Sequence, residues 1–348
     1  MDILTALSNN TNYSPRQLQL IIGAWVMTGL IPQKKKISLE NGDVAEGDYD
    51  KRSIYALLYS LYHAMGDVKS DQGVDYEMTF NTWGYSWPPE WGEFIIPSTE
   101  PQRFGMAAYL GLFAFPQVRE YIKARNGKVH VAEMGCGTGA GADLICSKLL
   151  KDCTYEAIDM QKAAIETCKR KFVPNHGGRL VATCGDATKV ATQTQPGTAD
   201  FVAVCETHVT EMPGVATEED RRFFATAHRL LKPGGYLVWG NAIPESTWKP
   251  CFDVLESVGL KVEDVRDVTK NAIKARDDDA RRAEALVQHC LDSYYGFKIP
   301  ILGHKKRIEA EAAIKNFYRH PGTNLYRNMQ VGIDTYKVVC AHKAIATA

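Results

Sequence analysis

Apolar and polar positions repeat in a regular order through the middle of the chain. Short apolar runs of strand length are each followed by a longer stretch whose apolar residues lie three and four positions apart, which predicts a helix. Strands are expected at 128–134, 154–158, 180–184, 199–205, 236–240 and 260–265. Helices are expected at 140–150, 161–172, 218–231 and 246–258. This alternation predicts an α/β fold with a doubly wound, mostly parallel sheet that has helices on both faces.

The pattern before residue 126 is mostly helical. Ser14-Pro15-Arg16-Gln17 combines a capping serine, a proline in the first turn and a glutamine three residues after the cap. These residues predict a helix that runs to about Gly29. Further helices are expected at 50–66, 103–110 and 118–125. We expect this region to cover the ligand side of the sheet.

The alternation stops again after residue 268. Two helices are expected around 279–294 and 305–318, with Pro300 between them, before a last strand at 335–341. The expected organisation has four parts: an N-terminal, mostly helical substrate or cap region (1–125), the core (126–268), a helical lid insertion (269–330), and the last core strand with a tail (331–348).

The charge and the length of the apolar segments exclude several classes of protein. The chain has 348 residues, with 41 Lys and Arg against 41 Asp and Glu. A net charge of zero supplies no overall attraction to a phosphate backbone, so no nucleic-acid partner is expected. The apolar stretch 18–32 is shorter than the roughly 20 residues that cross a bilayer, which favours a buried helix over stable membrane insertion. The nine cysteines contain no CxxC pair, which predicts reduced thiols in a cytoplasmic protein.

A glycine-rich loop is the strongest chemical signal in the sequence. Gly135-Cys136-Gly137-Thr138-Gly139 lies where a predicted strand passes into a predicted helix. Glycines permit a tight turn and a close approach of a ligand to the backbone, and the helix start offers free amides. The loop also fits the dinucleotide fingerprint, with Ala140 as its last small residue. Asp159, which ends the second strand, would bind ribose hydroxyls in either interpretation.

Three further features favour a ligand with a cationic amine over a dinucleotide. Glu133 lies two residues before the first glycine, where a carboxylate suits an amine and not a pyrophosphate. Asp186 and Ala187 follow the third strand, where the aspartate can accept from an adenine amino group. The stretch 230–238 predicts a helix, a turn and a strand in that order.

Together these motifs resemble those of the class I S-adenosylmethionine-dependent methyltransferases over about residues 126–265. Within that family, the small-molecule enzymes of the ubiquinone and sterol C-methyltransferase type are the most similar. The resemblance implies a Rossmann-like sheet of seven strands and S-adenosylmethionine as cofactor. The expected cofactor-binding residues are Tyr109, Glu133, Gly135, Cys136, Gly137, Thr138, Gly139, Asp159, Met160, Asp186, Ala187 and Cys205. Residues 1–97 have no counterpart in this resemblance.

Candidate catalytic residues follow the fourth strand, in Cys205-Glu206-Thr207-His208. His208 has a side chain that titrates near neutrality and is a candidate general base, although it could also orient the loop or face solvent. Glu206 is a candidate to hold a cationic or hydroxyl-bearing substrate. No pattern of acidic metal ligands is evident, so no metal is expected.

Residues 72–97 are rich in aromatic side chains and contain Pro88-Pro89, which excludes one regular helix. The segment is either hydrophobic packing or a wall of an apolar substrate pocket. If it is a wall, an aromatic or terpenoid-like substrate is favoured. Its aromatic residues are Tyr76, Phe80, Trp83, Tyr85, Trp87, Trp91 and Phe94.

These observations predict methyl transfer from S-adenosylmethionine to a small, apolar or aromatic metabolite, at O, C or N, with S-adenosylhomocysteine as the second product. The alternative is the same fold with a structural cofactor and another reaction, such as a cyclisation. A homodimer is a further expectation, because an apolar helix near residue 20 must be buried somewhere.

Overall fold

The computed structural model describes residues 34–38, 44–49, 80, 82–92, 96–189, 194–207, 213–295, 311, 315 and 319–345. It divides into two compact units. The larger comprises 79–275 and 329–348, and the smaller comprises 1–78 and 276–328. The helices expected at 15–29 and 50–66, and most of the one at 305–318, lie outside the described residues. The four-part organisation expected from the sequence stays a prediction.

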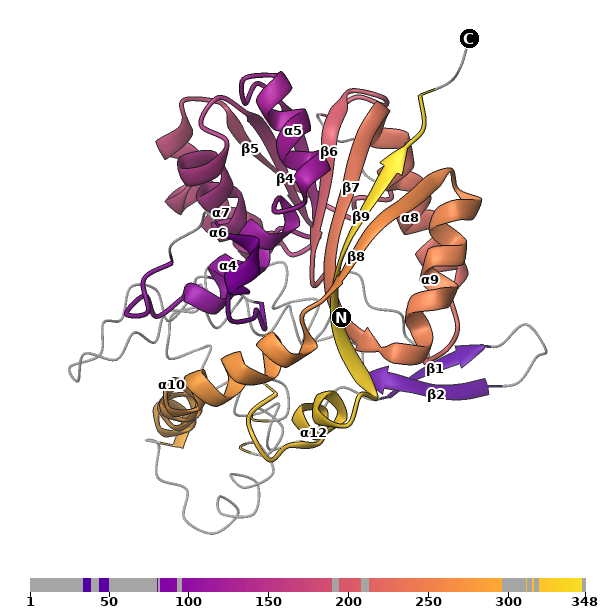
Figure 1. The fold of residues 1–348 in the computed structure, drawn as a ribbon. Coiled ribbons are helices and arrows are strands. Elements are labelled where there is room, and N and C mark those ends of the chain that lie inside the picture. The colour runs from indigo at the N-terminus through magenta and orange to yellow at the C-terminus, as the bar shows by residue number, and fades with distance from the viewer. Residues whose placement is uncertain are drawn as a thin grey trace. The chain divides into compact units, whose positions relative to one another are not determined.

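The larger unit is built on a seven-stranded sheet (Figure 1). Its strands are β3 (His130–Met134), β4 (Thr154–Asp159), β5 (Leu180–Cys184), β6 (Ala199–Cys205), β7 (Leu231–Pro244), β8 (Leu260–Asp267) and β9 (Asp334–Lys343). Their order across the sheet is β5-β4-β3-β6-β7-β9-β8. The first five are parallel, and β9 runs antiparallel to both neighbours. The predicted α/β fold with a mostly parallel seven-stranded sheet is therefore confirmed.

Both faces of this sheet are buried, which explains its nearly continuous apolar strands. Side chains alternate between the faces, so that Phe201 and Ala203 of β6 join one hydrophobic cluster while Val202 and Val204 join the other. Helices α4 (Arg103–Leu112), α5 (Pro116–Ala124), α6 (Ala140–Leu144) and α7 (Lys162–Lys171) lie on one side. Helices α8 (Glu218–Leu230) and α9 (Glu245–Ser257) lie on the other (Figure 1).

From β3 the sheet extends in one direction through β4 and β5, and in the other direction through β6 and β7. The strand order therefore reverses at β3. In sheets of this kind the carboxyl ends of the strands at such a reversal form the usual ligand site. The residues at the ends of β3, β4 and β6 are Met134, Asp159 and Cys205. The glycine loop, the expected ribose acid and the candidate catalytic segment therefore meet at one edge of the sheet.

Two elements differ from their expected limits for local reasons. Strand β7 begins at Leu231 and includes the expected turn, because Leu231 pairs with Ala199 and the register then shifts before Tyr236. Helix α10 (Thr269–Tyr295) begins ten residues earlier than expected. The Asp267 carboxylate accepts a hydrogen bond from the Thr269 amide, which satisfies one of the free donors of the first turn.

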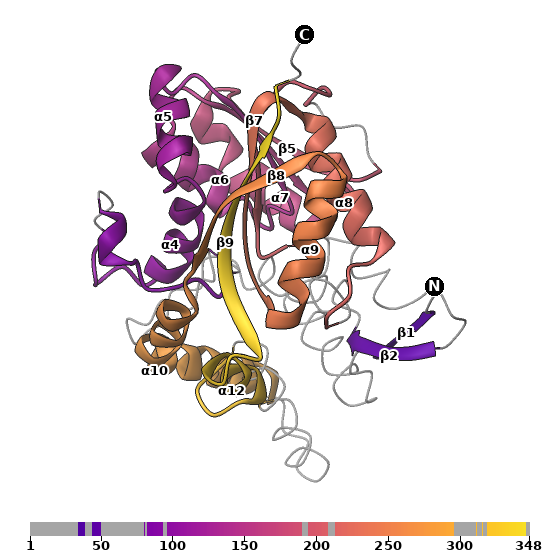
Figure 2. The same ribbon diagram turned by 45° about the vertical axis from the view of Figure 1, so that its right-hand side comes forward.

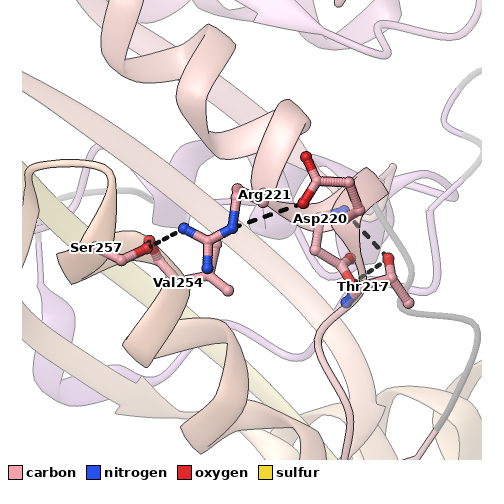
Figure 3. Close-up of polar contacts among 6 residues, drawn as sticks. Thr217, Asp220, Arg221, Val254 and Ser257 are labelled. Atoms are coloured by element: carbon pink, nitrogen blue, oxygen red, sulfur yellow. Dashed lines mark hydrogen bonds and ion pairs between the residues drawn. The ribbon is translucent and has the colours of Figure 1, made fainter. Parts of the chain in front are cut away.

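Helix α8 begins with a reciprocal cap (Figure 3). The Thr217 hydroxyl accepts from the Asp220 amide at 3.2 Å, and the Asp220 carboxylate accepts from the Thr217 amide. One residue later, Arg221 donates to the Ser257 hydroxyl at 2.9 Å and so joins α8 to α9. This contact joins the first turn of α8 to the last turn of α9.

The smaller unit contains a two-stranded antiparallel sheet of β1 (Lys34–Ser38) and β2 (Val44–Tyr49), which the sequence pattern did not predict. It also contains most of α10. There the Tyr326 hydroxyl donates to Asp277 at 2.5 Å, and Lys315 pairs with Glu284 at 2.8 Å. Tyr326 belongs to α12 (Asn324–Gln330).

Three short turns complete the described elements. Two are 3-10 turns, η1 (Pro89–Trp91) and η3 (Val173–His176). The third, η2 (Ile145–Leu149), is a π-turn that extends α6.

Candidate functional site

The glycine loop is a tight turn between β3 and α6. Gly135, Gly137 and Gly139 have φ values of 85°, 55° and 85°, a region that residues with a side chain rarely adopt. The amides of Gly135 and Cys136 both donate to the Ile158 carbonyl, at 2.7 and 2.9 Å. The turn is therefore fastened to β4 by its backbone.

Protein atoms occupy the space beside two of these glycines. A Cβ on Gly135 would lie 1.8 Å from the Thr207 methyl carbon, and a Cβ on Gly139 would lie 2.2 Å from the Cys168 sulfur. The sequence suggested that the absent side chains make room for a ligand. At these two positions they make room for the protein's own packing.

Thr207 is a site residue that the sequence did not single out. Its hydroxyl donates to the Gly135 carbonyl at 2.7 Å, and the Cys205 carbonyl, at 3.1 Å, is a second acceptor for the same hydrogen. The segment that follows β6 is therefore bound directly to the glycine loop. The two residues in this contact lie 72 positions apart, so a local sequence pattern cannot predict it.

Glu133 is fully buried near the end of β3. Tyr155 donates to its Oε2 at 3.0 Å, while Oε1 is buried without a well-formed hydrogen bond to any described residue. Burial raises the pKa of Glu133 to about 7, although the hydroxyls of Tyr155 and Tyr109 lower it. A buried carboxylate that is contacted by neutral hydroxyl groups suits a cationic ligand, whose charge would stabilise the ionised form.

Asp159 is also buried, at the end of β4. Its two oxygens accept from the amides of Gly137 and Gln161, each at 2.8 Å. Burial raises its pKa to about 6, and the two amides act in the opposite direction. Each carboxylate oxygen can accept more than one hydrogen bond, so both keep capacity for a ligand's hydroxyl groups.

The expected adenine-binding residues lie at the neighbouring strand ends. Met160 has an exposed fraction of 39%, which leaves its side chain accessible beside Asp159. Asp186 accepts from the amide and hydroxyl of Thr188 and pairs with Lys189 at 3.0 Å. Burial raises its pKa, but these contacts outweigh that effect and lower it overall. Ala187 packs against the hydrophobic cluster that contains Val202 and Val204.

The remaining expected cofactor residues are buried and uncharged. Tyr109 of α4 presses on α6, because a Cβ on Gly141 would lie 1.9 Å from its ring. Burial raises the pKa of the Cys136 and Cys205 thiols well above the usual value, which keeps both thiols neutral. Thr138 is buried within the glycine loop.

Glu206 and His208, the two candidate catalytic residues, differ in what the structure describes. His208 lies outside the described residues. Glu206 is buried, and its carboxylate accepts from the amides of Trp83 and Gly84 and from the Tyr336 hydroxyl. Its charge is therefore directed at protein donors, which the sequence did not indicate.

The described part of the aromatic segment packs against the hydrophobic cluster that contains Phe201 and Ala203. Tyr85 is fully buried, and its ring meets those of Trp91 and Tyr336 edge-on, at centroid distances of 5.8 and 5.3 Å. Trp83, Trp87 and Trp91 are partly buried against the same cluster. Packing is thus one role of this segment, while its half-buried tryptophans retain surface that a substrate can contact.

The residues present fit S-adenosylmethionine, the cofactor that the sequence resemblance implies. Glu133 offers a buried acceptor for an ammonium group, and Asp159 offers two for ribose hydroxyls. Among the described residues, no three His, Cys, Asp or Glu side chains are grouped as a metal site. No helix within the same residues is both long and apolar enough to span a membrane.

Comparison with known proteins agrees with this assignment. A family model described as a methyltransferase domain matches residues 131–235. Phthiotriol/phenolphthiotriol dimycocerosates methyltransferase of Mycobacterium tuberculosis (strain ATCC 25618 / H37Rv) is 23% identical over 268 residues, 77% of this chain and 86% of that protein. Fatty-acid O-methyltransferase of Mycolicibacterium smegmatis (strain ATCC 700084 / mc(2)155) is 26% identical over 229 residues, 63% of this chain and 76% of its own length.

Among solved structures, the 4+2 cyclase SpnF has a similar fold. The TM-score is 0.53 at 15% identity, over 76% of this chain and 88% of the cyclase. Similarity at this level of identity concerns the fold alone.

Proposed function

We propose that this chain, a class I S-adenosylmethionine-dependent methyltransferase, methylates an oxygen atom of a small, lipid-like acceptor. The observation that carries the cofactor assignment in this proposal is the pair of buried carboxylates, Glu133 and Asp159, at neighbouring strand ends beside the glycine turn. Bound S-adenosylmethionine supplies a methyl group on a sulfonium, which an acceptor oxygen can attack without a covalent enzyme intermediate.

In this proposal the protein holds the cofactor mainly through Glu133 and Asp159. Glu133 accepts from the cofactor's ammonium group, and Asp159 accepts from its ribose hydroxyls. The other contributors are the glycine loop with Cys136 and Thr138, the adenine-binding residues Met160, Asp186 and Ala187, and the neutral walls Tyr109 and Cys205. Burial of Glu133, Asp159, Tyr109 and Cys205 excludes water from this part of the site and fixes the direction of attack.

The class of acceptor rests on the related proteins and on the aromatic segment. The two relatives described above are named for a dimycocerosate lipid and for fatty acids. Trp83, Trp87 and Trp91 provide partly exposed apolar surface. The name of the Mycolicibacterium enzyme specifies oxygen, which favours a hydroxyl or carboxyl acceptor. For a hydroxyl acceptor, His208 is the proposed general base.

The proposal also includes the protein's location in the cell, its partners and its assembly. We place it in the cytoplasm, with a small-molecule substrate, no nucleic-acid partner and a homodimeric assembly. Equal numbers of acidic and basic residues support the absence of a nucleic-acid partner. Sedimentation velocity tests the dimer, since a single monomeric species at micromolar concentration would contradict it.

Calorimetry tests the cofactor assignment. S-adenosylhomocysteine is titrated into wild type, into Asp159→Ala and into Asp253→Ala, a control at an exposed position of α9, with NAD as a second ligand. We expect micromolar binding that Asp159→Ala weakens about tenfold or more, equivalent to about 1.4 kcal/mol. The control variant should bind like wild type. Preference for NAD, or no binding, would overturn the assignment.

A transfer assay tests the acceptor class. Cofactor with an isotopically labelled methyl group is supplied with long-chain fatty acids, long-chain alcohols and catechols, and products are identified by mass. We expect a methyl ester or methyl ether of a lipid-like acceptor. An acceptor converted without a gain of one methyl mass would favour the alternative, a cyclisation or other rearrangement with a structural cofactor.

A further inference from the structure

The Glu206 carboxylate is an anchor for two distant parts of the larger unit. Its Oε2 accepts from the Trp83 amide at 2.7 Å, and its Oε1 accepts from the Gly84 amide at 3.1 Å and from the Tyr336 hydroxyl at 2.7 Å. These donors lie 122 to 130 positions away in the sequence. One carboxylate therefore joins the end of β6 to the aromatic segment and to β9.

The backbone at Glu206 is shaped for this contact. Glu206 has a φ of 51°, a conformation that costs free energy for a residue with a side chain. Its amide donates to the Gly240 carbonyl at 2.8 Å, which ties the residue to β7. Strain of this kind persists only where surrounding contacts compensate for it, and the three hydrogen bonds to the carboxylate do so.

The aromatic segment fits closely against α4 where Glu206 holds it. A Cβ on Gly84 would lie 2.1 Å from the Phe104 carbonyl oxygen, and a Cβ on Gly111 would lie 1.7 Å from the Tyr85 hydroxyl oxygen. Beyond this point, Arg266 lies over the Trp91 ring at 4.8 Å. The segment is thus confined between α4 on one side and the Glu206 carboxylate on the other.

The next residue, Thr207, contacts the glycine loop through its hydroxyl and its methyl group. Residues 206 and 207 therefore contact the cofactor loop and the aromatic segment at once. A change at this dipeptide would alter the distance between the two.

We propose that Glu206 is a positioning residue, whose carboxylate sets the place of the Trp83-bearing segment relative to the glycine loop and so aligns the acceptor with the methyl donor. The kinetic part of this proposal rests on the proposed methyltransferase function. The structural part does not, because it concerns the amides of Trp83 and Gly84.

Hydrogen exchange tests the structural part. In Glu206→Gln one acceptor oxygen becomes an amide nitrogen, so at least one of the three donors loses its partner. We expect the peptide that covers 82–87 to exchange at least about tenfold faster, because its protecting hydrogen bonds open more readily. Tyr336→Phe, which removes one donor and keeps the ring, should produce a smaller change in the same direction.

Glu245→Gln is the matched control. Glu245 also accepts hydrogen bonds from β9, from Thr335 and Lys337, but its side chain is about half exposed. It should leave exchange at 82–87 unchanged. Unchanged exchange in both Glu206→Gln and Tyr336→Phe would overturn the proposal.

Steady-state kinetics separate positioning from direct catalysis. With Glu206→Gln we expect the KM for the acceptor to rise about tenfold, the affinity for S-adenosylhomocysteine to stay within about threefold, and the pH profile of kcat to keep its shape. A drop in kcat of about 100-fold or more with loss of one limb of the profile, and with normal exchange, would make Glu206 a catalytic residue instead. If no acceptor is methylated by wild type, the proposed function fails while the exchange result still decides whether Glu206 is the anchor.

Discussion

At the scale of single residues, the site is a group of buried acids held by neutral donors. Glu133 is held by a tyrosine, Asp159 by two amides, and Glu206 by two amides and a tyrosine. The donors in these hydrogen bonds are uncharged hydroxyl and amide groups. A cationic ligand beside Glu133 or Asp159 would favour the ionised carboxylate, which burial disfavours.

The raised pKa of Glu133 predicts how stability depends on pH. Because the folded protein binds this proton more tightly than the unfolded chain, the contribution is full below pH 4.5 and is lost as pH rises through about 7. The loss amounts to about 3 kcal/mol for a shift of this size. Urea unfolding of the ligand-free protein from pH 4.5 to 8 measures it. Asp159, whose pKa is raised to about 6, adds to the slope below about pH 6, so Glu133→Gln should flatten the slope mainly between about pH 6 and 7. An identical slope between pH 6 and 7 in the variant would contradict the assignment.

The sequence identified the acids of the site but not their partners. Glu133 and Asp159 stand at fixed distances from the glycine loop, so a local pattern was sufficient to find them. Tyr155 and Tyr336 contact their acids across 22 and 130 positions. Contacts between different strands depend on strand order, which apolar periodicity does not encode.

At the scale of elements, the predicted strands and helices of the core agree with the structure to within a few residues. Strong periodicity and glycine turns mark their positions. The exceptions are elements whose ends are determined by partners, such as β7 through its pairing with β6 and α10 through the Asp267 cap. The aromatic segment has no regular periodicity, and its shape comes from packing on α4.

The cap of α8 gives a prediction at this scale. Thr217→Ala removes the hydroxyl that accepts from the Asp220 amide, and it should lower the free energy of unfolding by about 1 kcal/mol. Thr217→Ser keeps the hydroxyl and should remain close to wild type. Chemical denaturation of the three proteins measures the difference, and equal destabilisation by both variants would exclude the cap as its cause.

At the scale of the whole larger unit, another buried acid, Asp200, lies at the end of the sheet opposite the glycine loop. Asp200, at the start of β6, accepts from the Tyr121 hydroxyl and the His130 amide, both at 2.8 Å, and pairs with Lys232. It joins α5, β3 and β7 at the end of the sheet that lies away from the glycine loop.

This arrangement predicts that a mutation at Asp200 can lower the stability of the fold without lowering the affinity for the cofactor. Asp200→Asn should lower the free energy of unfolding by about 2 kcal/mol, because it removes the charge of a buried, hydrogen-bonded acid. The affinity for S-adenosylhomocysteine should stay within about twofold. Denaturation and calorimetry on one preparation measure both, and a large loss of affinity would show that the two ends are coupled.

The place of β9 in the sheet has a consequence for synthesis of the protein. This strand is the last described one in the sequence, yet it lies between β7 and β8 (Figure 2). During translation β7 and β8 are complete long before the strand that joins them, so their facing edges stay unpaired until residues 334–343 leave the ribosome. Because Tyr336 also belongs to β9, the Glu206 anchor closes in that same last step.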